Sequence, residues 1–198
     1  MTETVDAARR TLMLNDLRLP AIEQDWAASA ARADKESWHA ARLLASLAEH
    51  EIAERDRRRL ARHLAEAQLL PSKTLDSLDF SVVPMISKAH VLAICAGDSW
   101  INKGANLILI GGPGGGKTHM ASAIGLALVE NGWRVLFTRT SDLVQRLQVA
   151  RREIALEAAI NRLDRFDLLI LDDLAYVSKD QAETIEGSAF DPQESPHF

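Results

Sequence analysis

The most informative segment of the sequence reads Gly111-Gly112-Pro113-Gly114-Gly115-Gly116-Lys117-Thr118. It matches the pattern G-x-x-x-x-G-K-[ST] at every fixed position. Glycines let the backbone curl so that several N–H groups point inward, and no side chain blocks the approach of a densely anionic group. Lys117 would reach the β- and γ-phosphates of a nucleoside triphosphate, and the Thr118 hydroxyl would coordinate magnesium. The segment therefore predicts a triphosphate-binding loop.

The flanking residues agree with this interpretation. Residues 107–110 form a continuous apolar run, which predicts a strand buried on both faces. After the loop, Met120, Ile124 and Leu128 recur four residues apart, which places them on one face of a helix. A glycine-rich turn with a chance lysine would not need this strand–loop–helix context. The segment does not match the pattern of a dinucleotide-binding loop, because the third glycine of G-x-G-x-x-G would fall on Lys117.

Strand and helix patterns alternate downstream of the loop. Residues 135–138 (Val-Leu-Phe-Thr) and the apolar run 168–171 predict two further strands, with helices between them. Asn131-Gly132 predicts a helix stop, and Ser141 can cap the helix that follows. A last helix is expected around residues 156–163. This alternation predicts an α/β fold with a parallel sheet, of the P-loop NTPase type.

Two aspartates, Asp172 and Asp173, follow the last apolar run. An apolar strand that ends in an acidic residue is how this type of fold holds magnesium opposite the phosphate loop. Asp172 would bind Mg²⁺, and Asp173 would orient or activate the attacking water. Both could instead simply solvate a strand end, but their position downstream of a phosphate loop favours the functional interpretation.

The amino-terminal third has a different character. Residues 11–70 contain no glycine and are rich in Ala, Leu, Arg and Glu, which are strong helix formers. Pro20 separates a first short helix from a second. We expect a small helical domain at residues 1–70. Residues 71–104 read as a connector with a short helix at about 87–96.

A basic cluster lies in the predicted helical domain: Arg55, Arg57, Arg58, Arg59 and Arg62. Acidic residues are interspersed with it, which favours a solvated helix face with i,i+4 pairs, and contact with DNA phosphates remains the alternative. His50 and His63 are expected on the surface of the same helix.

Composition limits the classes of function. The chain has 198 residues, 47% apolar and 26% charged, which is typical of globular proteins. The net charge of −5 argues against a strongly basic nucleic-acid binder, although a local basic face is possible. Cys95 is the single cysteine, so an internal disulfide is excluded. The sequence lacks a signal-peptide pattern and an apolar run of roughly 20 residues, so we expect a cytoplasmic protein without a membrane span.

These residues together resemble the IstB-like ATP-binding proteins, helper ATPases of certain bacterial transposons. That family is similar to helicase loaders of the DnaC type and to the replication initiator DnaA. The resemblance extends over roughly residues 14–183. It rests on the segments 73–80, 106–121, 132–135, 141–143 and 167–176.

The resemblance implies an AAA+ ATPase core at residues 105–183, behind a helical domain that binds a partner or DNA. It implies ATP and Mg²⁺ as cofactors. His119 then joins the phosphate loop among the nucleotide-binding residues, and Lys117 and Asp173 are the expected catalytic residues. Family members bind DNA without strong sequence preference, work with a transposase, and assemble as ATP-dependent homo-oligomers. A nonhydrolysing interaction protein and a helicase loader remain the alternatives.

The sequence departs from the family near its end. Residues 184–198 have no apolar periodicity and two prolines, which predicts a disordered tail. The family core continues with a strand that bears a polar sensor residue, and then with an arginine that reaches a neighbouring subunit's ATP. That strand lies between the phosphate-loop strand and the Asp172 strand, so these two are not expected to pair here. We expect a truncated core, weak or absent hydrolysis, and exposed strand edges that lower stability.

Overall fold

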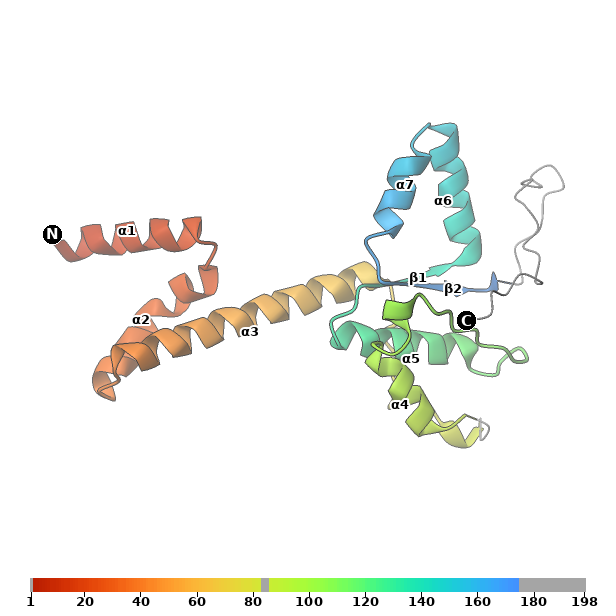
Figure 1. The fold of residues 1–198 in the computed structure, drawn as a ribbon, viewed down its shortest axis with the longest axis horizontal. Helices are drawn as coiled ribbons and strands as arrows, with labels where there is room; N and C mark the ends of the chain where they lie inside the picture. The colour runs from red at the N-terminus through yellow and green to blue at the C-terminus, as the bar shows by residue number, and fades with distance from the viewer. Residues whose placement is uncertain (1, 83–85, 175–198) are drawn as a thin grey trace, which may run out of the picture.

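A computed structural model describes residues 2–82 and 86–174 of the chain (Figure 1). The described helices are α1 (Thr2–Asp16), α2 (Pro20–Lys35), α3 (Ala40–Ala67), α4 (Lys88–Ala96), α5 (Lys117–Glu130), α6 (Thr140–Arg152) and α7 (Leu156–Leu163). The strands are β1 (Val135–Arg139) and β2 (Leu168–Asp172), and short 3-10 turns occur at Phe80–Val82 and Ile101–Lys103. The predicted disordered tail at 184–198 lies outside the described residues.

The two strands pair in parallel, with Val135 opposite Leu168 and Arg139 opposite Asp172. Parallel neighbours need a crossover connection, and the helices α6 and α7 supply it. Figure 1 shows α6 and α7 on one side of the strands and α5 on the other. The predicted α/β class with a parallel sheet is therefore confirmed, as an incomplete sheet of two strands among the described residues.

The strand predicted at residues 107–110 is wrong, because this segment has no regular secondary structure. Leu107, Ile108 and Ile110 are 41%, 73% and 90% exposed. An apolar run becomes a buried strand only where a neighbouring strand offers it a ladder of hydrogen bonds, and in the described residues β2 pairs with β1 instead. The expectation that the phosphate-loop segment and the Asp172 strand do not pair is confirmed.

The main core forms around α5. Leu128 and Val129 are fully buried, and the partly buried Ile170 of β2 packs against the same cluster. A Cβ atom added at Gly125 would lie 2.7 Å from Ile170 Cδ1 and 2.8 Å from Leu69 Cδ2. Glycine in mid-helix costs backbone entropy, and here it allows the strand and the segment after α3 to approach α5 closely.

The helix α3 spans 28 residues and packs at both of its ends. Its first half buries Leu47 and Glu51 against α2, and its second half buries His63 and Ala67 near α5 and β1. In Figure 1, α1, α2 and the first half of α3 extend away from the core. The prediction that His50 lies on the surface is confirmed, whereas the same prediction for His63 is wrong because the second half of α3 packs on the core.

Several predicted boundaries are confirmed. Pro20 is the first residue of α2, a position where its missing N–H costs no helical hydrogen bond. The helix α4 begins directly after Ser87, and α5 ends at Glu130, directly before Asn131 and Gly132, whose φ is +94°. Ser141 does not cap the next helix. Instead α6 begins one residue earlier, at Thr140.

His63 makes the stability of the fold depend on pH. Its Nδ1 atom is buried without a hydrogen-bond partner. Burial, and then the nearby charges of Arg134 and Arg62, lower the pKa of His63 below its ordinary value of 6.5. The unfolded chain therefore binds more protons than the folded chain as the pH falls through about 6.5, and stability decreases in that window.

Replacing His63 by Leu is expected to remove this decrease in the free energy of unfolding between pH 8 and pH 5.5. Urea denaturation at the two pH values measures it. His50→Leu is the matched control, because His50 is exposed on the same helix and should leave the pH dependence unchanged. An identical pH dependence in the parent and in His63→Leu would contradict the assignment.

Candidate phosphate-binding site

The glycine-rich segment forms an exposed loop that leads into α5 at Lys117. Gly114 and Gly116 have φ angles of +75° and +77°, a left-handed conformation that side chains with a Cβ atom rarely adopt. The backbone N–H groups of the first helical turn have no partner within a helix, and the helix dipole is positive at this end. The loop and the start of α5 therefore form a backbone suited to an anion.

Lys117 lies with its ammonium group folded back on the loop. Its Nζ atom donates hydrogen bonds to the carbonyl oxygens of Gly111 and Gly112, each at 2.9 Å. In the described part of the chain, no ion pair joins Lys117 to a carboxylate. The Lys117 ammonium group therefore contacts only neutral oxygens at the glycine loop. A phosphate group is a suitable counter-ion for it.

The structure brings together Thr118 and Asp172, which are far apart in the sequence. The Thr118 hydroxyl lies 3.0 Å and 3.1 Å from the two carboxylate oxygens of Asp172 at the end of β2. Thr140 donates from its hydroxyl to the backbone carbonyl of Asp172 at 2.8 Å, which fixes the strand end. A hydroxyl and a carboxylate are the hard oxygen ligands that Mg²⁺ prefers.

No group of three or more His, Cys, Asp or Glu residues that could hold a metal occurs among residues 2–82 and 86–174. The lack of such a group in these residues is compatible with a magnesium site, because magnesium is typically held by one or two carboxylates together with substrate phosphates and water. Thr118 and Asp172 are the residues that would hold it.

Asp173 lies directly after β2 and is exposed, with a φ angle of +57°. A left-handed backbone at a residue other than glycine is uncommon and occurs often near functional sites. Its predicted role toward water stays a prediction, as do the roles of Pro113 and Gly115 in the loop.

His119 contacts the connector. Its Nε2 atom lies 2.9 Å from the Ser77 hydroxyl and 3.2 Å from the Thr74 carbonyl oxygen. Because a carbonyl only accepts, Nε2 carries the proton in the bond to Thr74. One turn later, the Ser122 hydroxyl accepts the backbone N–H of Leu70 at 3.1 Å. These side chains attach the segment after α3 to the helix that begins at the phosphate loop.

Sequence reasoning missed these contacts to the connector. The only local signal was the hydroxyl pattern Thr74-x-x-Ser77, which forms a hydrogen-bonded turn in the structure. The assignment of His119 as a nucleotide ligand stays a prediction.

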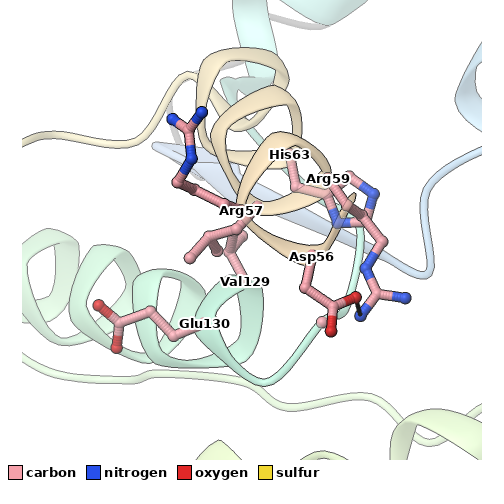
Figure 2. Close-up of a pocket in the computed structure, with 8 residues that line it drawn as sticks. Asp56, Arg57, Arg59, His63, Val129 and Glu130 are labelled. Carbon is pink, nitrogen blue, oxygen red and sulfur yellow. Dashed lines mark ion pairs between the residues drawn. The ribbon is translucent and has the colours of Figure 1, made fainter. Parts of the chain in front are cut away.

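The arginine cluster is largely neutralised by acidic partners on α3. Four of its members lie within 4.0 Å of a carboxylate three or four residues away: Arg55 with Glu51, Arg57 and Arg58 with Glu54, and Arg59 with Asp56. The predicted solvated face with helical ion pairs is confirmed. A pocket of about 400 Å³ lies beside this face, where α3 passes the end of α5 near Val129 and Glu130. Figure 2 shows the residues that line it. This pocket is separate from the phosphate loop.

The fold and the loop define a class of protein. A parallel α/β sheet, a glycine loop at the start of a helix and a strand that ends in aspartate are the features of a P-loop NTPase fold, here incomplete. The family profile of the IstB-like ATP binding protein matches residues 12–186, and the chain belongs to this family. No described helix is long and apolar enough to cross a membrane.

Named relatives agree with this assignment. The chain is 68% identical over 181 residues to a putative insertion sequence ATP-binding protein of Sinorhizobium fredii (strain NBRC 101917 / NGR234), which covers 91% of this chain and 61% of that protein. It is 36% identical over 129 residues to the insertion sequence IS21 putative ATP-binding protein of Pseudomonas aeruginosa, covering 65% of this chain and 48% of that protein.

A more distant match is the replicative helicase loader DnaC of Buchnera aphidicola subsp. Baizongia pistaciae (strain Bp). It is 33% identical over 84 residues, which cover 41% of this chain and 34% of that protein. The chain thus spans about three fifths of the Sinorhizobium relative and a smaller share of the other two.

Proposed function

We propose that this chain is an ATP-binding helper protein of DNA transposition, which holds ATP and Mg²⁺ at its phosphate loop. The observation that carries the proposal is Lys117, whose ammonium group is held by two carbonyl oxygens at 2.9 Å and lacks an acidic partner in the described residues. Lys117 and the loop N–H groups would hold the phosphates, and Thr118 and Asp172 would hold the metal. A bound triphosphate with magnesium would supply an anhydride bond that can be hydrolysed.

The proposed partners are a transposase and DNA bound without strong sequence preference. The relatives' names assign those proteins to insertion sequences, which supports this role. In the helical domain proposed at residues 1–70, α1, α2 and the first half of α3 extend away from the core (Figure 1). Leu12, Met13, Leu17 and Leu44 are each 50% exposed or more in this part of the chain. Exposed apolar side chains in this region are available to a protein partner, which supports a transposase contact there.

The same region is less suited to DNA. Because four arginines of α3 already have acidic partners, contact with phosphates would have to replace those ion pairs. We therefore propose that the helical region binds the transposase first, and that DNA contact depends on the assembled complex. Assembly as a homo-oligomer is proposed for the longer relatives.

A pull-down experiment tests the partner. The full chain should recover the transposase of its own insertion sequence, and Leu12→Glu combined with Leu17→Glu should remove most of that recovery. Val149→Glu combined with Ile160→Glu, on α6 and α7, is the matched control and should retain it. Recovery of the replicative helicase instead of the transposase would favour a helicase loader. Recovery that is insensitive to both pairs would contradict the assignment of the surface.

We also propose that the chain alone hydrolyses ATP slowly compared with its longer relatives. Residues 107–110, which lead into the loop, have no strand partner among the described residues, and Asp173 is exposed. Electrostatic catalysis depends on groups that are fixed in position before the reaction. Here a single strand end, that of β2, holds the site in position. Turnover equal to that of the Sinorhizobium relative would contradict this part of the proposal.

A further inference from the structure

We propose that His119 is a positioning residue for ATP, whose side chain acts on the phosphate loop through the connector and does not touch the nucleotide. This inference rests on the ATP site proposed above and adds a regulation of that site. The turn at residues 74–77 and the bound nucleotide would stabilise each other through His119, which lies in the first turn of α5.

The first turn of α5 has no side-chain cap among the described residues. The residue before it is Gly116, which has no side chain to accept the first N–H groups of the helix. Order in this turn therefore depends on contacts with other segments. Thr118 contacts Asp172 at the end of β2, and His119 contacts the connector. Lys117 and Thr118, the proposed ligands of the phosphates and the metal, belong to the same turn.

The connector presents His119 with a turn that is itself fixed. The Ser77 hydroxyl accepts the N–H of Thr74 at 3.0 Å, and the Thr74 hydroxyl accepts the N–H of Ser77 at 3.2 Å. Leu75 within the turn and Leu78 directly after it pack against the buried cluster around α5. The Ser77 hydroxyl and the Thr74 carbonyl oxygen, at 2.9 Å and 3.2 Å from Nε2 of His119, are therefore held in place to receive it.

A second contact holds the same segment one turn further along α5. Ser122 is fully buried, and its hydroxyl accepts the N–H of Leu70, three residues after the end of α3. His119 is only half-buried and Ser77 is exposed. Hydrogen bonds near solvent open at a lower free-energy cost than those in a core. The contact closest to the phosphate loop is therefore the one that can open while the Ser122 contact stays closed.

This arrangement makes the two ends of the contact depend on each other. A closed contact holds the first turn of α5 in place before ATP arrives, so less ordering remains to oppose binding. Thermodynamic linkage requires the reverse effect to be equal, so bound ATP would stabilise the closed connector by the same factor. Because the connector follows α3, the state of the phosphate loop would reach the helical region through it.

ATP affinity of the full chain, measured with a fluorescent ATP analogue, tests the role of His119. His119→Ala should weaken binding about tenfold, as expected for the loss of tertiary hydrogen bonds. Ser77→Ala should also weaken binding, and the double variant should bind no more weakly than His119→Ala, because both changes break one contact. His119→Gln should retain most of the affinity, since its amide group can donate to both oxygens.

His90→Ala and Ser81→Ala are the matched controls, because both residues are exposed, on α4 and in the connector, and should leave the affinity unchanged. Normal affinity in Ser77→Ala together with weak binding in His119→Ala would make His119 a direct nucleotide ligand and overturn the proposal. Additive losses in the double variant, or an unchanged affinity in His119→Ala, would also overturn it.

Hydrogen exchange of residues 70–79 tests the reverse effect. Saturating ATP should slow their exchange in the parent but not in His119→Ala at a concentration that saturates this variant. A parent that binds ATP and shows the same exchange with and without it would overturn this proposal and leave the ATP site intact. A parent that does not bind ATP at all would contradict the proposed function, and this inference with it.

Discussion

Replacing Lys117 by Ala is expected to weaken ATP binding about 100-fold, which corresponds to about 3 kcal/mol. The side chain provides the cation of the loop, and its present partners are two carbonyl oxygens that a phosphate can replace as acceptors. Hydrogen bonds between charged groups are stronger than those between neutral groups, so the variant loses more than a single neutral contact would provide. A titration of the full chain with a fluorescent ATP analogue, followed by anisotropy, measures the change.

Lys103→Ala is the matched control for this substitution. Lys103 is also exposed and lies in the short turn at Ile101–Lys103, before the segment that leads to the loop. Its removal changes the net charge of the chain by the same amount and should leave the affinity within about threefold, as expected for a charge screened by solvent. An equal loss of affinity in the two variants would show that general charge, and not the loop, attracts the nucleotide.

Replacing Glu51 by Ala is expected to lower the free energy of unfolding of the helical region by about 3 kcal/mol. Glu51 is 3% exposed on α3, and its Oε2 atom accepts the backbone N–H groups of Ala21 at 2.8 Å and Ile22 at 3.1 Å. Its Oε1 atom accepts a hydrogen bond from the Nε–H group of Arg55 at 3.0 Å. The residue before α2, Leu19, cannot cap the helix through its side chain, so Glu51 caps it from the neighbouring helix.

Truncation of Glu51 leaves two buried donors without an acceptor. Hydrogen exchange of the amides of α2, Pro20–Lys35, measures the effect, and the first turn should exchange fastest. Glu54→Ala is the control on the same helix, because Glu54 pairs with the exposed Arg57 and its removal should change exchange much less. Equal protection of α2 in the parent and in Glu51→Ala would contradict the cap.

The cap also has a defined pH dependence. Burial raises the pKa of Glu51, but the hydrogen bonds from Ile22, Arg55 and Ala21 outweigh burial, and the pKa ends below its ordinary value of 4.5. The stabilisation is therefore present above about pH 4.5 and is lost as the pH falls through the lower folded pKa. The pH range in which Glu51 loses its stabilising effect lies below the pH range assigned to His63. The two contributions to the free energy of unfolding can therefore be measured separately.

The parts of the site that could be predicted from the sequence are those fixed by local chemistry. Gly114 and Gly116 adopt left-handed angles as a phosphate loop requires, and Asp172 ends a strand next to Thr118. The helix with Met120, Ile124 and Leu128 on one buried face followed directly from spacing.

The parts that could not be predicted depend on contacts between distant segments. An apolar run such as residues 107–110 does not show whether a neighbouring strand is present. The burial of His63, the cap formed by Glu51 and the contact of His119 with Ser77 each join residues from different elements. Periodicity within one helix carries no information about these partners.

The most direct measurement is a calorimetric titration of the full chain with ATP in the presence of Mg²⁺. We expect saturable binding of one nucleotide per chain, lost in Lys117→Ala and retained in Lys103→Ala. A parent chain that shows no heat of binding and no displacement of a fluorescent ATP analogue, or a Lys117→Ala chain that binds as tightly as the parent, would contradict a nucleotide site at the phosphate loop.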